Sequence, residues 1–285
     1  MASMEKSTFI TLIVLNALSI ILCLFAIVIY IIAKPLRNYA FKLVFWMNLA
    51  DLLRSISQII PKFYRQSYEI CQILGFFHVF SSIFSLYWAL VIAITIYQVL
   101  VKQILDVEKY YKYWFGFSLS ISSICGIIPI FLNDISYLHE KCTINESFKG
   151  MITKFSEFYI PAFIITIINT VIFYKVYIVL KEEDEVIISK DKNDAKRLFY
   201  YPIILVIAII PSMIENILSF FNFESGDLEF ISELTWALQC ILNSACYTLT
   251  KPIKAYISSI CKNKKSFLFE GSELNNESIT LENFL

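Results

Sequence analysis

The stretch 71–100, CQILGFFHVFSSIFSLYWALVIAITIYQVL, decides the fold class of this chain. It contains no Asp, Glu, Lys or Arg over its whole length. About 20 mostly apolar residues are enough to cross the hydrocarbon core of a bilayer as a helix. The stretch therefore predicts a membrane-spanning helix.

The composition of the whole chain agrees with this interpretation. Of its 285 residues 58% are hydrophobic and only 17% are charged, whereas globular domains carry about 25% charged residues. The 25 Phe and 17 Tyr residues suit a protein whose aromatic rings line bilayer interfaces. The formal net charge is zero, and no basic tract indicates a nucleic-acid partner. We therefore expect an integral protein whose solvent is the lipid bilayer.

Seven apolar windows are long enough to span: 9–33, 40–61, 72–101, 112–132, 156–180, 199–221 and 230–250. The first is too long for the apolar region of a signal peptide and is expected to remain in the protein. The predicted fold is an all-α bundle of seven transmembrane helices. Residues 1–257 would form this seven-transmembrane domain, and residues 258–285 a cytoplasmic tail.

The positive charges indicate the orientation. With the N-terminus outside, the inner connectors and the proximal tail hold 15 Lys and Arg residues, and the outer segments hold six. Cytoplasmic loops carry the excess of Lys and Arg. The N-terminus is therefore predicted outside and the C-terminus inside.

Two cysteines fall outside the spans on the predicted outer side, Cys71 and Cys142. Oxidation is permitted there, so we expect a disulfide between them; the alternative is two free thiols at the interface. The tripeptide NES at 145–147 is an acceptor sequon on the same side, which makes Asn145 a candidate for glycosylation.

Three stretches carry a family resemblance: 71–100 above, KRLFYYPIILVIAIIPSMIENI at 196–217 and NSACYTLTKPIK at 243–254. They resemble the third, sixth and seventh helices of G-protein-coupled receptors, most closely the cyclic-AMP-receptor-like group of social amoebae, ciliates and other protists. They also share features with fungal sugar-sensing receptors. The Asp-Arg-Tyr motif of rhodopsin-like receptors is absent, and residues 95–97 read Thr-Ile-Tyr in its place.

The resemblance implies a signal-transducing receptor of the plasma membrane, with no cofactor, metal or enzymatic activity. An extracellular ligand, which the sequence does not identify, would bind between the helices. A heterotrimeric G protein would then contact the inner face near Lys196 and Arg197 as the sixth helix moves. The alternative for these two residues is that they merely flank the membrane as positive-inside charges. Cys261 is a candidate for palmitoylation in the inner tail.

Asp51 and Arg54 are charged residues inside the second predicted span. Each costs about 2.5–3.5 kcal/mol at the centre of a bilayer, so such residues usually face the bundle interior. By the family resemblance, Asp51 belongs to a mid-depth polar core that acts as a switch, made of Asp51, Ser85, Gln239, Asn243 and Tyr247. The alternative is a purely structural Asp51–Arg54 pair, because residues at i and i+3 share a helix face.

An outer cavity is expected between the helices, at the depth where many receptors contact their ligands. Its predicted ligand-binding residues are Arg54, His78, Ser82, Glu215 and Trp236. For His78 the alternative is a packed residue with no ligand contact. Pro211, four residues before Glu215, would kink the sixth helix. The competing function is a small membrane transporter that uses Asp51 and Arg54 in a translocation path.

Overall fold

The computed structural model describes residues 2–34, 37, 39–63, 67–104, 106–138, 141–145, 147–182, 200–221, 223, 226–250 and 253–259. The chain divides into two units, residues 1–247 and residues 248–285, which are taken separately. The first unit is mostly helical and holds all of the candidate site residues that the structure describes.

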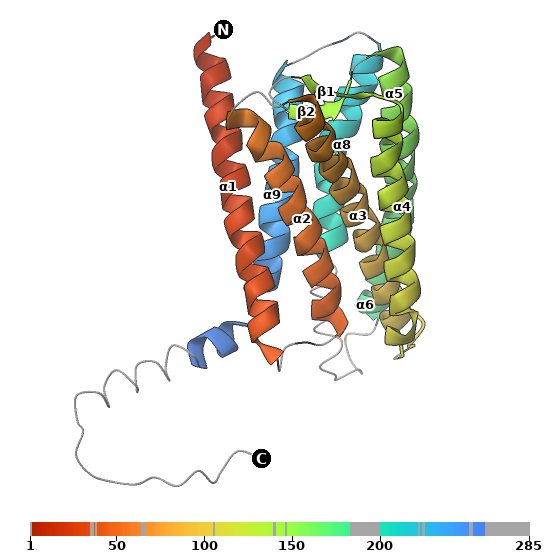
Figure 1. Ribbon diagram of the computed structural model, residues 1–285. Coiled ribbons are helices and arrows are strands. Elements are labelled where there is room, and N and C mark those ends of the chain that lie inside the picture. Colours follow the sequence, from red (N-terminus) through yellow and green to blue (C-terminus); the bar gives the residue numbers. More distant parts are fainter. Residues whose placement is uncertain are drawn as a thin grey trace, which may run out of the picture. The chain divides into compact units, whose positions relative to one another are not determined.

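A helix lies on each of the seven apolar windows (Figure 1). These helices are α1 (Ala2–Ile32), α2 (Tyr39–Phe63), α3 (Tyr68–Leu100), α4 (Tyr111–Phe131), α6 (Ile160–Glu182), α8 (Tyr200–Phe220) and α9 (Gly226–Thr248). A short 3-10 turn, Glu108–Tyr110, precedes α4. Within the described residues, five helical segments are long and apolar enough to cross a membrane, and the apolar part of α8, Ile203–Ser219, is shorter. The chain is a multi-pass membrane protein, and the full seven-span topology stays a prediction.

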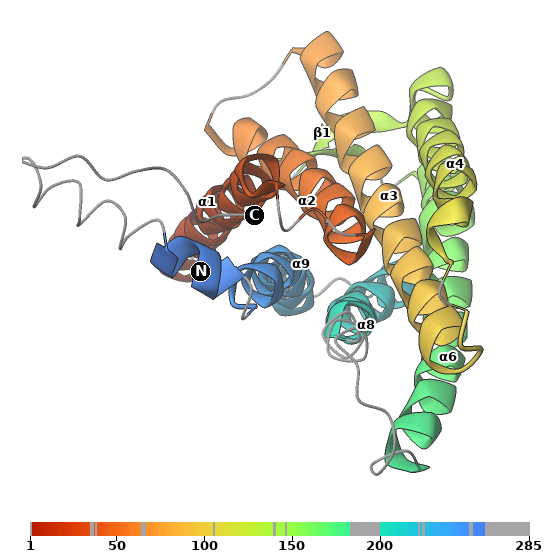
Figure 2. The same ribbon diagram turned by 90° about the horizontal axis from the view of Figure 1, so that it is seen from below.

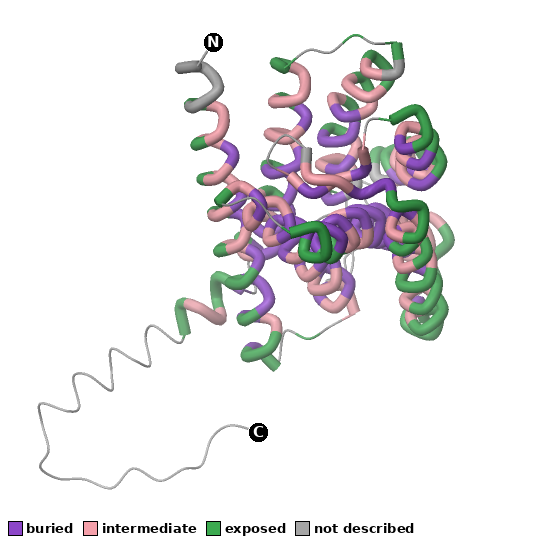
Figure 3. Tube along the Cα trace, turned by 45° about the horizontal axis from the view of Figure 1, so that its top comes forward, coloured by how far each residue is buried: buried purple, intermediate pink, exposed green. Residues whose placement is uncertain are grey.

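Helix α3 occupies the centre of the bundle. It packs against α2, α4, α6 and α8, and the view along the bundle in Figure 2 shows it crossing between these neighbours. Trp88 and Ile92, in the second half of α3, are fully buried. By contrast α1, α4 and α6 expose large apolar side chains along their outer faces, among them Ile21, Phe117 and Phe163. Figure 3 shows this division between buried inner stretches and exposed outer ones. Apolar residues facing outward are what a lipid solvent favours.

One β-hairpin departs from the predicted all-helical architecture. Strands β1 (Ile135–Leu138) and β2 (Lys141–Ile144) pair antiparallel, with Tyr137 opposite Cys142. Cys142 is joined to Cys71 at the start of α3, so the expected disulfide is present. Gly75 lets the hairpin lie against α3, because an added Cβ would come within 2.6 Å of the Ile135 side chain. The predicted connector therefore folds over one end of the bundle, which is called the hairpin end below.

The helix predicted from residue 156 begins earlier than expected, at Phe148 within the connector. Helix α5 (Phe148–Lys154) continues through a π-helical turn, Phe155–Tyr159, into α6. The side chain of Ser147 caps α5 by accepting a hydrogen bond from the backbone N–H of Gly150. Inserting a π turn rotates the residues that follow relative to an ideal helix, and such turns are frequent at functional sites.

The second unit contains a helix over residues 253–259, inside the stretch expected to follow the last span. Ser259 donates a hydrogen bond to the Tyr256 carbonyl over 2.7 Å. Residues 183–199 and 260–285 lie outside the described part of the chain, and with them Lys196, Arg197 and Cys261. The predicted G-protein contact, the predicted lipidation and the predicted domain boundary at 257 remain predictions.

Candidate functional site

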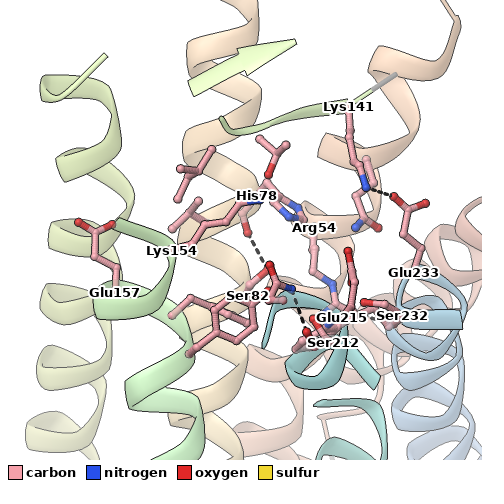
Figure 4. Close-up of a pocket in the computed structure, with 18 residues that line it drawn as sticks. Arg54, His78, Ser82, Lys141, Lys154, Glu157, Ser212, Glu215, Ser232 and Glu233 are labelled. Carbon is pink, nitrogen blue, oxygen red and sulfur yellow. Dashed lines mark hydrogen bonds and ion pairs between the residues drawn. The ribbon is translucent and has the colours of Figure 1, made fainter. Parts of the chain in front are cut away.

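The structure contains a cavity of about 140 Å³ at the hairpin end, enclosed by α2, α3, β2, the segment from Lys154 to Tyr159, α8 and α9. The five residues predicted to bind a ligand all line it: Arg54, His78, Ser82, Glu215 and Trp236. They come from α2, α3, α8 and α9, so the fold brings together residues that are up to 182 positions apart in the chain, Arg54 and Trp236. Figure 4 shows the side chains around this cavity.

Arg54 is the most unusual residue of the cavity, because it is charged and only 2% exposed. Its Nη2 donates to the carbonyl oxygen of Trp236 over 2.7 Å and to Cys240 Sγ over 2.8 Å. The guanidinium carbon also lies 4.5 Å from the centroid of the Trp236 ring, a cation–π distance. The remaining two nitrogens, Nε and Nη1, are buried and have no hydrogen-bond partner.

His78 and Ser82 form the wall of the cavity that α3 contributes. Ser82 donates its hydroxyl hydrogen to the His78 carbonyl over 2.7 Å (Figure 4). The Nδ1 atom of His78 is buried without a partner. Across the cavity lie Glu215, half-buried on α8, and Ser232 of α9. These groups offer donors and acceptors to a bound molecule from two sides.

Lys141 of β2 forms the rim of the cavity together with two carboxylates of α9. Its Nζ lies 2.7 Å from Glu229 Oε1 and 2.5 Å from Glu233 Oε1. Glu233 is also 3.8 Å from the Nζ of Lys62 on α2. Burial alone would lower the pKa of Lys141, but the carboxylates of Glu233 and Glu229 outweigh it and hold this pKa above its usual range. The rim charges are therefore balanced within the protein.

Sequence reasoning missed Glu157, which the π turn places on the cavity wall. Glu157 is 8% exposed, and its carboxyl oxygen Oε2 has no hydrogen-bond partner. The sequence places Glu157 at the beginning of the fifth apolar window, where an acid reads as an ordinary boundary residue. No pattern in the sequence indicates a π turn at this position.

Asp51 lies deeper in the bundle and is completely buried. Its Oδ1 accepts a hydrogen bond from the Ser85 hydroxyl over 3.1 Å, and its Oδ2 accepts one from Asn243 Nδ2 over 2.9 Å. Among the described residues it forms no ion pair with Arg54, whose bonds go to Trp236 and Cys240 instead. The structural Asp51–Arg54 pair, kept as an alternative above, is therefore not what the side chains form.

The other two residues of the predicted polar core are buried nearby on α9. Gln239 Oε1 and the Tyr247 hydroxyl are buried atoms without hydrogen-bond partners, and the Tyr247 ring packs edge-on against Phe41. Ser244, the residue after Asn243, donates to Asn48 Oδ1 over 2.6 Å. The switching role of this core remains a prediction.

The sequon residue Asn145 follows β2 directly. Its side-chain oxygen accepts hydrogen bonds from the backbone N–H and the hydroxyl of Ser147, the serine of the sequon. These bonds tie the sequon to the start of α5. Glycosylation of Asn145 remains a prediction.

Comparison with known proteins identifies the family. Residues 1–260 match the family described as slime mold cyclic AMP receptor. This chain belongs to the slime mold cyclic AMP receptor family. The resemblance drawn from 71–100, 196–217 and 243–254 is thereby confirmed. A role as a membrane receptor follows from the family.

Curated relatives carry receptor names as well. The chain is 27% identical over 261 residues to G-protein coupled receptor 1 of Arabidopsis thaliana, a match covering 85% of this chain and 78% of the relative. It is 25% identical over 242 residues to cyclic AMP receptor-like protein A of Dictyostelium discoideum, covering 83% of this chain and 62% of that protein. Cyclic AMP receptor 4 of the same organism is 27% identical over 58% of this chain and 38% of its own length.

Proposed function

We propose that this protein is a G-protein-coupled receptor of the plasma membrane with seven spans, its N-terminus outside and its C-terminus inside. An extracellular ligand binds in the cavity beneath the hairpin, and a heterotrimeric G protein binds at the opposite, cytoplasmic end. The observation that carries the proposal is the cavity itself, which is lined by all five predicted residues, among them a buried, incompletely bonded Arg54.

Helix α8 is the element that would transmit the signal. Its residues beyond Pro211, including Ser212 and Glu215, line the cavity, and its residues before Pro211 continue toward the other end of the bundle. A proline in a helix interior removes one hydrogen bond and favours a kink, which makes a pivot. A ligand that pulls on the outer part would swing the inner part, including the stretch near Lys196 and Arg197.

Trp236 supports a mechanical connection between ligand and α8. Its carbonyl oxygen accepts a hydrogen bond from the Arg54 guanidinium, which also lies over its ring. It also belongs to the apolar cluster that contains Leu205 and Ile209 of α8 and Leu86 of α3. A shift of Arg54 upon binding would therefore move a side chain that packs directly against the moving helix.

The test is nucleotide exchange on G proteins co-expressed with the receptor, under a panel of soluble metabolites. The panel includes cyclic AMP because the names of two Dictyostelium relatives point to it. Ligand-dependent exchange that is lost in Pro211→Ala, with surface amounts equal to the unmodified protein, would support the proposal. Uptake of a solute into proteoliposomes without any exchange would instead favour the transporter built on Asp51 and Arg54.

A further inference from the structure

We infer that the cavity opens to solvent between the hairpin and α9, and that the ion pairs of Lys141 with Glu229 and Glu233 are the latch that closes this opening. In this arrangement the hairpin is a lid that stays attached to α2, α3 and α5 and separates from α9 alone. The inference goes beyond the proposed function, because it concerns how a molecule reaches the cavity and holds whichever molecule binds there.

On the side of α2 and α3, the hairpin is fixed by contacts that do not depend on charge. A disulfide joins Cys142 of β2 to Cys71 of α3. Gln72 of α3 donates a hydrogen bond to the carbonyl of Ile135 over 2.9 Å, and the hydroxyl of Tyr137 donates to a backbone carbonyl of α2 over 3.2 Å. Salt screens interactions between charges, so it does not loosen this side of the lid.

The side next to α5 is fixed around one buried carboxylate, that of Asp134. The backbone N–H of Asn145 donates to the Asp134 carbonyl over 2.6 Å, which extends the hairpin as far as Asp134. The Thr153 hydroxyl of α5 donates to Asp134 Oδ2 over 3.0 Å, and Lys149 Nζ lies 3.3 Å from Oδ1. Lys149 also donates to the Leu132 carbonyl over 2.6 Å. Opening on this side would strip a buried acid of its partners, which is costly.

On the side of α9, Lys141 reaches from β2 to two carboxylates. Its Nζ lies 2.7 Å from Glu229 and 2.5 Å from Glu233, and Figure 4 shows this side chain extending from the strand toward Glu233 on the neighbouring helix. The side chains of Lys141 and Glu233 are 23% and 19% exposed, so water and salt ions reach the pair. Ion pairs in contact with water contribute little free energy. This is therefore the side on which the lid separates most easily.

The partners of the latch are arranged so that it can open without stranding a charge. Glu233 also lies 3.8 Å from Lys62 Nζ on α2, so it keeps one cation when Lys141 leaves. Lys141 and Glu233 both line the cavity, together with Arg54 and Trp236. Their separation therefore exposes the cavity itself. Lids of this kind, fixed on one side and released on the other, control access to many binding sites.

The experiment measures access to the cavity with a cysteine reporter, so it needs no knowledge of the ligand. Gln58 of α2 is half-buried and lines the cavity. Purified full-length protein with Gln58→Cys is treated in detergent with two methanethiosulfonate reagents, one carrying a trimethylammonium group and one a sulfonate. Each reagent forms a mixed disulfide with a free thiol, and intact-mass spectrometry gives the rate. The protein without the reporter gives the contribution of the native cysteines.

Lys141→Gln removes the latch and should raise the rate of modification about 5-fold or more with both reagents, because an open mouth admits either charge. A change of local charge alone would raise the rate with the cationic reagent and lower it with the anionic one. Lys141→Arg keeps the ion pairs and should leave both rates nearly unchanged. NaCl at 1 M should raise both rates when Lys141 is present and have a smaller effect in Lys141→Gln.

Lys149→Gln is the matched control, because it removes one positive charge from the same connector on the side of α5. It should leave both rates nearly unchanged. A second reporter, Ser7→Cys at the exposed start of α1, should react equally in every variant. Glu229→Gln combined with Glu233→Gln breaks the latch from α9 and should give the same increase as Lys141→Gln, so the test does not depend on the folding of one variant.

The inference is overturned if Lys141→Gln leaves both rates unchanged, if the two rates move in opposite directions, or if Lys149→Gln raises them equally. A reporter at residue 58 that stays unreactive in every variant also counts against it, because the cavity then does not open when the latch is broken. These outcomes leave the receptor proposal standing, since that proposal is tested by nucleotide exchange. A failure to observe exchange would in turn leave the latch in place.

Discussion

Asp51 and Arg54 lie one turn apart on α2 and are almost equally buried, yet their surroundings differ in one respect. Both carboxyl oxygens of Asp51 are hydrogen-bonded, to Ser85 and to Asn243. Two of the three guanidinium nitrogens of Arg54 have no partner, and the residue borders a cavity. The protein therefore satisfies both carboxyl oxygens of Asp51 by itself and leaves two nitrogens of Arg54 without a hydrogen bond. Charged groups inside a membrane are costly and mark candidate functional sites, and these two are accommodated in different ways.

The comparison predicts its largest effect for Asp51→Ala. The change strands the Ser85 hydroxyl and the Asn243 amide, and an unsatisfied buried polar group costs about 1–3 kcal/mol, so the two together cost about 2–6 kcal/mol. The measurement is the melting temperature in detergent together with the amount of protein at the cell surface. Asp51→Asn is the matched control. Because Asn243 Oδ1 is unpaired, the Asn243 amide can rotate and accept from the new amide. A loss in Asp51→Asn as large as in Asp51→Ala would contradict this account.

The same control separates folding from switching. If the polar core acts as a switch, Asp51→Asn should reach the surface while its ligand response, per surface receptor, is shifted or lost. A dose–response curve identical to that of the unmodified receptor would leave Asp51 with a structural role alone.

The second prediction acts on the cavity and spares the Asp51 core. Replacing Cys71 and Cys142 together by serine removes the link that holds the hairpin on α3. Loss of a native disulfide typically costs about 2–4 kcal/mol. We expect a lower melting temperature and weaker ligand binding at a temperature where the protein remains folded. The control is serine replacement of Cys23, a buried free cysteine whose Sγ lies 3.2 Å from the Ser244 hydroxyl, away from the hairpin. Unchanged ligand binding in the double variant would show that the hairpin does not shape the cavity.

A third prediction compares two serines one turn apart on α3. Ser85→Ala leaves Asp51 Oδ1 without a partner and should cost about 1–3 kcal/mol. Ser82→Ala removes only a bond to a carbonyl of its own helix and should stay within about 0.5 kcal/mol. Melting temperatures of the two variants, measured side by side, provide the check. Equal losses would mean that the hydrogen bond from Ser85 to Asp51 contributes no more to stability than a bond within one helix.

The smallest effect is expected at the rim of the cavity. Lys141→Gln removes contacts to Glu229 and Glu233 and should cost about 1 kcal/mol, since partly exposed ion pairs contribute little. Because salt screens such pairs, the difference from the unmodified protein should shrink in 1 M NaCl. The control is Lys109→Gln, whose pair with Asp106 is exposed and which should be neutral. A loss that persists at high salt would indicate that Lys141 acts by packing.

The sequence by itself determined that the chain is helical and membrane-embedded, because the need to satisfy every backbone group in lipid turns each long apolar run into a helix. It also determined that Asp51, Arg54, His78, Ser82, Glu215 and Trp236 face inward, since lipid excludes polar groups and the helical period places them. Only the tertiary structure decided which partners they meet. Asp51 and Arg54 share a helix face, but helix packing sets α9 so that Asn243 reaches Asp51 while Trp236 and Cys240 reach Arg54. The hairpin and the π turn that presents Glu157 depend on contacts between distant segments, such as Ile135 against Gly75, which no local pattern encodes.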